Sequence, residues 1–368
     1  HIEDITPLSG LVNLISLNLK DDFVSYDDGN TFTDISSLSN LTKLTTLLLG
    51  TKKDENINIE YLSSLTSLED LSLSHLNVSN IDSLSNLTNL EHLTLSSLNV
   101  SDIEFLSNLT NLTSLNLGCC NITDITPLKN LTNLTYLYLA QNQIEDISIL
   151  SNLKNLTNLS LYWNKVSNIT ILANLTKLTH LNLDYNQIAN ISVLSNLTNL
   201  NELRLSYNNI ADITPLVNLN NLKTLSLGAN KINYNIEKNG IQKVELPTII
   251  TEAKNKDTKI LGMYTEKDYE LVNCTLSEDG KTIVIDTNNV KEASIKIKEG
   301  TANSTTLNIT VTTNASNNNQ NNIIDSTVVP DEKLPQTGID ITIIISIIVI
   351  SVIAVTIYIK GRNYKDIK

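Results

Sequence analysis

The sequence predicts an α/β-type solenoid, with a parallel β-sheet on its concave face and 3₁₀ turns on its convex face. Three observations predict this fold. Leucines recur at a fixed period over residues 1–235. Within each period, apolar and polar residues alternate over a short stretch, as in a half-buried strand. The rest of each period carries apolar residues at every third position, which suits a 3₁₀ turn.

The period is that of leucine-rich repeats. Eight strand-opening leucines follow one another at intervals of 22 residues: Leu68, Leu90, Leu112, Leu134, Leu156, Leu178, Leu200 and Leu222. Two earlier units open at Leu14 and Leu44, with spacings of 30 and 24 residues. These ten units predict a leucine-rich repeat solenoid, in which each unit buries its apolar face against its neighbours.

The stretch from Leu178 to Ile188 illustrates the strand half of a repeat. Leu181 and Leu183 alternate with polar residues, so one face of the strand is buried and the other is open. Asn186 follows, and we expect its side chain to bond the turn backbone in an internal ladder. Other repeats place Asn, Cys or Leu at this position: Asn142, Asn164, Asn208, Asn230, Cys120, Leu76 and Leu98.

The return half of each repeat is spaced by threes, as in Ile213, Leu216, Leu219 and Leu222. Residues three apart eclipse one another in a 3₁₀ helix, so this spacing favours 3₁₀ turns over α-helix. A proline opens three of these turns, where its missing N–H costs little. These prolines are Pro7, Pro127 and Pro215.

The repeat period ends near Asn233, and short β-rich runs follow. Residues 281–285, 293–297 and 307–311 alternate, with Asp279-Gly280 and Glu299-Gly300 as turn signals between them. Residues 236–313 are therefore expected to form a small all-β sandwich. Residues 314–333 are polar and rich in asparagine, which predicts a disordered stalk.

The last segment, residues 334–368, carries three elements in order. Leu334-Pro335-Gln336-Thr337-Gly338 comes first. A run of 19 uncharged residues, 341–359, is near the ~20 that a transmembrane helix needs. A basic tail follows, so the tail should stay inside while the rest of the chain faces outward.

This arrangement resembles the cell-wall sorting signal of a class A sortase substrate. The resemblance implies that the sortase thiolate attacks the Thr337 carbonyl and that Gly338 leaves. Thr337 then becomes amide-linked to peptidoglycan, and the membrane span is used only transiently. The resemblance therefore implies a protein of a Gram-positive cell wall, displayed on its extracellular face. A plain transmembrane anchor is the alternative, but it does not explain the five-residue motif.

The repeats themselves resemble the internalin family of bacterial surface proteins. The residues that carry the resemblance are Asn-Leu-Thr-Asn-Leu, Leu-x-Leu-x-x-Asn-x-Ile and Asp-Ile-Thr-Pro-Leu, as in 196–216. The family resemblance implies ligand binding on the concave face and an immunoglobulin-like module in 236–313. Because the sequence begins inside a repeat, we also expect a signal peptide and an N-terminal cap upstream.

A candidate ligand-binding face lies two, four, six and seven residues after the opening leucines. Those positions gather aromatic and charged residues in four successive repeats: Tyr136, Tyr138, Tyr162, Trp163, Asp184, Tyr185, Arg204 and Tyr207. Trp163, Tyr185 and Tyr207 share one position, so we expect them to stack in a column. Exposed aromatics with an arginine are typical of binding hot spots, although the tyrosines could instead only cover neighbouring turns.

The sequence gives little support to a nucleic-acid, metal or catalytic site. The net charge of −13 argues against a nucleic acid partner, since phosphates need a basic face. Asp21, Asp22, Asp27, Asp28 and Asp34 match no calcium-loop spacing, and we read them as an acidic surface loop. His180 near Asp184 and Glu202 is read as a solvated polar face. We expect no metal, no cofactor and no catalytic constellation.

The sequence thus predicts a sortase-anchored, non-enzymatic surface protein. In the first interpretation it is an adhesin whose concave face binds a host protein or another surface ligand. The alternative is a structural component that binds glycan or wall polymer without a host protein receptor. The expected partners are a class A sortase, peptidoglycan and a host protein or glycan.

Overall fold

The computed structural model describes the repeats almost throughout and the later chain only as strands. The described residues are 2–20, 29–51, 56–74, 76–216, 218–237, 241–245, 259–260, 269–272, 275–276, 282–286, 292–299 and 303–312. The predicted stalk and sorting signal lie outside them, as does the acidic loop except for Asp34. Within the described residues, no helix is long and apolar enough to cross a membrane.

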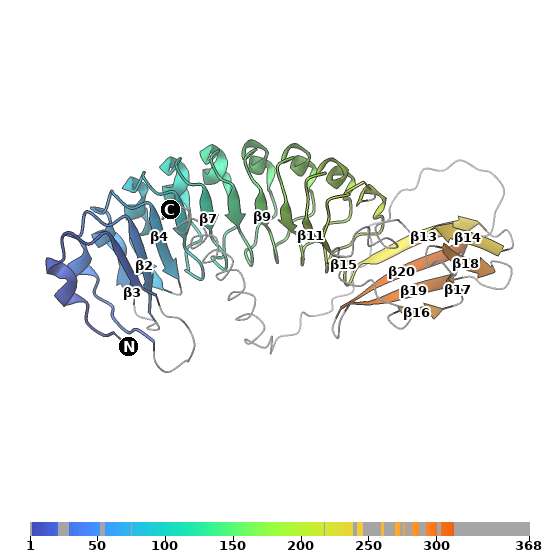
Figure 1. Cartoon of the computed structure of the whole chain (residues 1–368), viewed down its shortest axis with the longest axis horizontal. Helices are drawn as coiled ribbons and strands as arrows, with labels where there is room; N and C mark the ends of the chain where they lie inside the picture. The colour runs from blue at the N-terminus through green and yellow to red at the C-terminus, as the bar shows by residue number, and fades with distance from the viewer. Residues whose placement is uncertain are drawn as a thin grey trace, which may run out of the picture. The chain divides into compact units, whose positions relative to one another are not determined.

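The repeats contribute ten strands to a parallel sheet of 11, which confirms the predicted solenoid; the last strand, β15, comes from residues 259–260, inside the range predicted as a β-sandwich. Strands β4, β7, β9 and β11 appear in this order along the stack in Figure 1, with the strands between them unlabelled. Equivalent positions pair directly, as His180 does with Glu202, 22 residues on. In sheet order the strands are β1 (Ser16–Leu19), β2 (Thr46–Gly50), β4 (Asp70–Ser74), β6 (His92–Thr94), β7 (Ser114–Asn116), β8 (Tyr136–Tyr138), β9 (Asn158–Ser160), β10 (His180–Asn182), β11 (Glu202–Arg204), β12 (Thr224–Ser226) and β15 (Lys259–Ile260).

Each return segment contains a short 3₁₀ helix, as the spacing of three predicts. Proline stands in the first turn of η1 and η6. The helices are η1 (Thr6–Gly10), η2 (Ser36–Leu38), η3 (Ile59–Leu62), η4 (Ile81–Asn86), η5 (Glu104–Asn108), η6 (Thr126–Asn130), η7 (Ser148–Asn152), η8 (Thr170–Asn174), η9 (Ser192–Asn196) and η10 (Thr214–Leu216). β3 (Asn56–Asn58) and β5 (Asn77–Ser79) add a two-stranded parallel sheet.

An Asp or Asn two residues before the turn anchors many of these helices. The Asp124 carboxylate accepts the Thr126 N–H at 2.8 Å, and the Asn168 side chain accepts the Thr170 N–H at 3.0 Å. Such short polar side chains bond backbone groups that the helix start leaves unpaired.

The core is one continuous column of aliphatic side chains that runs through the repeats. Leu178, Leu181 and Leu183 are at most 1% exposed, and their counterparts in other repeats are similar. A fully buried leucine contributes about 2 kcal/mol by the removal of its apolar surface from water. The stacked repeats therefore derive most of their stability from neighbours in the next repeat rather than from within one repeat.

The predicted asparagine ladder is confirmed. The Asn186 Nδ2 donates to the carbonyls of Leu161 and Leu183 at 2.8 and 3.1 Å, and its Oδ1 accepts the Val166 N–H at 3.0 Å. Cys120 substitutes for asparagine as expected, since its thiol donates to the Leu95 carbonyl at 2.9 Å. Burial raises the pKa of Cys120 to about 11, so the thiol remains protonated and able to donate.

The later strands form two further sheets. Strands β13, β20, β19 and β16 make a four-stranded sheet in which β13 and β20 are parallel, and β14, β18 and β17 make an antiparallel one. The alternating runs of the sequence lie in β18, β19 and β20. The bounds are β13 (Lys231–Glu237), β14 (Ile241–Glu245), β16 (Tyr269–Val272), β17 (Thr275–Leu276), β18 (Thr282–Asp286), β19 (Glu292–Glu299) and β20 (Asn303–Thr312).

Candidate functional site

In seven successive repeats, a left-handed backbone position directs one side chain outward where the chain leaves the sheet. Its φ is 56° at Trp163, 56° at Tyr185 and 54° at Tyr207. The other repeats place smaller or flexible residues there: Ser97, Cys119, Gln141 and Ala229, also with positive φ. Residues with a Cβ adopt this conformation at a cost of about 1–2 kcal/mol each.

Trp163, Tyr185 and Tyr207 stack on one another, and we call them the aromatic column. The Trp163 and Tyr185 ring centroids are 5.1 Å apart with planes 9° from parallel. The Tyr185 and Tyr207 centroids are 4.0 Å apart at 14°. The repeat spacing of the sheet thus brings together residues 22 positions apart, as the sequence predicts.

Three more tyrosines extend the aromatic surface. Tyr162 meets Trp163 and Tyr185 edge-on, with centroid distances of 6.0 and 5.5 Å. Tyr136 and Tyr138 are half-buried on β8. The Tyr138 ring occupies the space of an absent side chain at Gly118, where a Cβ would stand 2.8 Å from its Cε1. Burial raises the pKa of Tyr136, Tyr138 and Tyr162, so these hydroxyls stay neutral.

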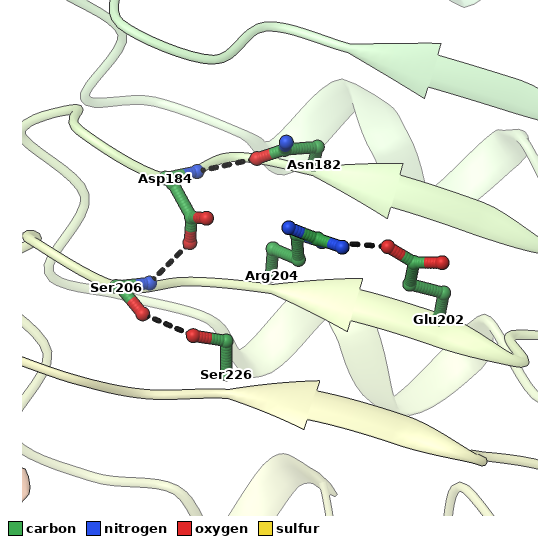
Figure 2. Close-up of polar contacts among 6 residues, drawn as sticks. All are labelled: Asn182, Asp184, Glu202, Arg204, Ser206 and Ser226. Carbon is green, nitrogen blue, oxygen red and sulfur yellow. Dashed lines mark hydrogen bonds and ion pairs between the residues drawn. The ribbon is translucent and has the colours of Figure 1, made fainter. Parts of the chain in front are cut away.

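The column has a polar border on β11. Figure 2 shows Arg204 and Glu202 facing each other on this strand, with Arg204 Nε 2.6 Å from Glu202 Oε1. Both side chains are partly exposed, so the pair is solvated and contributes little to stability. It leaves the positive charge of Arg204 neutralised at the edge of the aromatic surface.

Asp184 belongs to the predicted ligand face, but the structure gives its carboxylate a structural partner. Asp184 is buried, and its Oδ1 accepts the Ser206 N–H at 2.6 Å (Figure 2). The Asp184 N–H in turn donates to Asn182 Oδ1 at 3.0 Å. The side chains of Ser206 and Ser226 continue this contact into the next repeat. Asp184 thereby fixes the backbone from which Tyr185 and Tyr207 project.

Two residues that the sequence analysis did not select also border the column. Gln141 and Cys119 occupy the position of Trp163 in the two preceding repeats, and the Cys119 thiol donates to Gln141 Oε1 at 2.6 Å. Burial raises the pKa of Cys119, so this thiol also remains protonated. Their register with Trp163 was visible in the sequence, but their polar character concealed their role beside an aromatic surface.

His180 is exposed on β10, and its Nδ1 lies 2.9 Å from the Thr179 hydroxyl. Within the described part of the chain, no group of three His, Cys, Asp or Glu side chains could hold a metal ion. Leu334, Pro335, Gln336, Thr337 and Gly338 lie outside the described residues.

The comparisons with known proteins support the repeat fold. A family model described as leucine-rich repeats in two copies matches residues 88–130, 110–152 and 132–174. The crystal structure of an internalin, inlF from Listeria monocytogenes, is 38% identical with a TM-score of 0.55, and the match covers 63% of this chain and 72% of that one. The chain belongs to the internalin family. No curated protein sequence matches significantly.

Two further solved structures are similar to this internalin-family chain. Internalin C2 of L. monocytogenes is 39% identical over 51% of this chain and 83% of its own, with a TM-score of 0.49. The plant peptide hormone receptor RGFR1, in complex with RGF2, is 23% identical with a TM-score of 0.54, covering 64% of this chain and 39% of that one. The plant likeness shows the repeat fold alone.

Proposed function

We propose that this internalin-family chain is a non-enzymatic binding protein of the bacterial surface, and that the aromatic column and its neighbours contact the ligand. One observation carries the proposal. Three aromatic residues occupy a strained left-handed position in successive repeats, and one of them, Trp163, is 37% exposed. A repeat needs no aromatic there for stability, since Ser97 and Ala229 fill the same position elsewhere.

The composition of the surface supports a protein ligand. Trp, Tyr and Arg are the residues most enriched in binding hot spots, and such residues cluster near the centre of an interface. Tyr162 and Trp163 follow β9, which pairs with β8 of Tyr138 and is separated by β10 from β11 of Arg204. The rings are already held by one another, so little side-chain freedom is lost when a ligand binds.

The alternative ligand is a glycan or wall polymer. A sugar ring packs on an open aromatic face, but the stacking of the aromatic column covers the faces between Trp163, Tyr185 and Tyr207. Apart from the outer face of Trp163, these rings present mainly their edges to a ligand. This arrangement favours a protein, which can contact ring edges and hydroxyls together.

We further propose that the chain is displayed by sortase anchoring at Leu334–Gly338. The five-residue motif, the apolar run 341–359 and the basic tail support this proposal. Thr337 would be joined to peptidoglycan, and the polar residues 314–333 would space the binding part from the wall. The two small sheets, one of β13, β20, β19 and β16 and one of β14, β18 and β17, support an immunoglobulin-like sandwich at 236–313 as the connecting module.

The binding proposal is tested by replacing Trp163, Tyr185 and Tyr207 together with alanine. The triple variant should keep the circular dichroism spectrum of the solenoid but lose binding to host cells. Tyr61→Ala is the matched control, because Tyr61 is 39% exposed on η3, in a return segment. A folded triple variant that binds host cells as well as Tyr61→Ala would refute the proposal.

A further inference from the structure

One face of Trp163 is not used by the aromatic column. Tyr185, in the next repeat, lies parallel to Trp163 and covers the face on the β10 side. The opposite face of the indole is turned toward β8 and the repeat of Gln141. Trp163 is also the most exposed ring of the aromatic surface, at 37%. Among the described residues no second ring stacks on that opposite face, so the aromatic column ends there with Trp163.

Tyr162 does not cover this face. Its centroid is 6.0 Å from Trp163 and 5.5 Å from Tyr185, and its plane is nearly perpendicular to both. A ring on the outer face of Trp163 would be much farther from Tyr185 than from Trp163. The near equality of the two distances places Tyr162 beside the stack, along the edges of both rings.

Gln141 is the residue whose side chain could reach across the open face, and it is held away from it. Cys119 lies one repeat further toward the N-terminus, and its thiol donates to Gln141 Oε1 at 2.6 Å. This hydrogen bond draws the Gln141 amide toward β7, away from Trp163. Because burial raises the pKa of Cys119, the thiol keeps its proton and the bond persists at neutral pH.

The electrostatics favour a cation on this face. The ring face of tryptophan carries negative potential and is the best aromatic partner for a cation. The chain has 39 acidic and 26 basic residues, so its field attracts basic partners. Arg204, the arginine of the surface, is neutralised by Glu202 at 2.6 Å.

We propose that the outer face of Trp163 binds an arginine or lysine side chain from a basic segment of the protein ligand, and that Cys119 and Gln141 are positioning residues that keep this face open. The inference rests on the proposed function and specifies its partner. A neutral sugar could also pack on one open ring face, but it would gain nothing from the acidic charge of the chain. A glycan is therefore a competing outcome of the test.

The test uses the emission of Trp163, which is the one tryptophan in the sequence. The full chain is titrated at physiological ionic strength with nona-arginine, with its uncharged analogue nona-citrulline, and with chitohexaose. Nona-arginine should change the emission with half-saturation at a concentration about tenfold lower than nona-citrulline requires. Equal responses to the two peptides, or a response to chitohexaose without one to nona-arginine, would overturn the inference.

Variants separate the face of Trp163 from general attraction to an acidic protein. With fluorescein-labelled nona-arginine followed by anisotropy, Trp163→Ala should weaken binding about fivefold, in the range of a cation–π contact. Tyr61→Ala should not change it. Cys119→Ala should weaken binding in the same direction, whereas Cys119→Ser keeps a hydrogen-bond donor and should bind as the native chain does. Equal binding by Trp163→Ala and Tyr61→Ala would contradict the inference.

The two proposals fail in different ways. Loss of host-cell binding in the column variant, with no preference for arginine over citrulline, would retain the binding surface and refute the cationic partner. Undiminished host-cell binding by that variant would refute the binding surface itself.

Discussion

Replacement of Asn186 by alanine should destabilise the solenoid by about 2 kcal/mol, because it leaves the buried Val166 N–H without its partner and removes one of two side-chain donors from each of the Leu161 and Leu183 carbonyls. The Asn186 side chain is 8% exposed and donates to the carbonyls of Leu161, Leu183 and Asp184 at 2.8, 3.1 and 3.2 Å. Its Oδ1 accepts the Val166 N–H at 3.0 Å. The Asp184 carbonyl also accepts the Trp163 N–H, so it keeps a partner in the variant.

The estimate follows from the groups that remain. The Val166 N–H loses its partner, whereas the Leu161 carbonyl keeps the Asn164 side chain as a donor and the Leu183 carbonyl keeps that of Asn208. A buried polar group without a partner costs about 1–3 kcal/mol, and entry of water into the vacated space offsets part of the sum. Asn186→Cys should lose less than Asn186→Ala, since Cys120 shows that a thiol can donate to the preceding repeat.

The assay is equilibrium unfolding in guanidinium chloride, with midpoint and slope fitted for each variant. Asn199→Ala is the control, because Asn199 is exposed and donates to a single carbonyl, that of Thr176, at 2.8 Å. Its effect should stay within ~0.5 kcal/mol, as for most surface changes. A loss in Asn186→Ala no larger than that in Asn199→Ala would refute the ladder as a source of stability.

Three further predictions concern the column, the turns and the anchor. Tyr185→Asn should change the free energy of unfolding by no more than ~1 kcal/mol, because asparagine tolerates the left-handed conformation and this gain offsets the lost ring contacts. Urea unfolding measures the change, with Leu183→Ala, which should lose about 2–5 kcal/mol, as the comparison. Hydrogen bonds from the Thr126 N–H and hydroxyl lower the pKa of Asp124 from its ordinary value. The stabilisation that the Asp124 carboxylate contributes is therefore present above the pKa of the unfolded chain and is lost as the pH falls through the pKa of the folded chain. Asp124→Asn should therefore reduce the drop in Tm between pH 7 and pH 3, as the neutral Asn168 in the equivalent position suggests, and an unchanged drop would contradict this. Thr337→Ala should abolish the wall-linked fraction seen after muramidase digestion, whereas Gln336→Ala, at the variable position of the motif, should retain it; wall linkage of Thr337→Ala would exclude the proposed junction.

The repeats could be predicted because the residues within each repeat determine its structure. The leucine period, the alternation around Leu181 and the spacing from Ile213 to Leu222 together determine strand, turn and buried face. The position of Asn186 predicts its ladder because a buried turn leaves backbone groups that need a partner. The stacking of Trp163 on Tyr185 follows from the same register, since equivalent residues in a solenoid become neighbours.

The sequence was less informative where a side chain could turn in two directions. Asp184 lies between Leu183 and Tyr185, and an acidic residue there could face solvent or cap the next repeat. Only the position of the Ser206 N–H decides that it is buried. Likewise, the effect of Cys119 on Gln141 depends on side-chain torsions, and the space that Gly118 leaves for Tyr138 depends on how that ring packs. These are contacts between repeats that no pattern within one repeat encodes.

Site-specific photocrosslinking at position 163 tests the central claim most directly. The photoreactive residue p-benzoylphenylalanine replaces Trp163 in one variant and Tyr61 in another, and each full-length variant is irradiated on intact host cells. If the concave aromatic surface holds the ligand, position 163 should give a discrete crosslinked species that unlabelled native chain competes away, and position 61 should give none. A competed species at position 61 with none at position 163 would show that the ligand binds elsewhere.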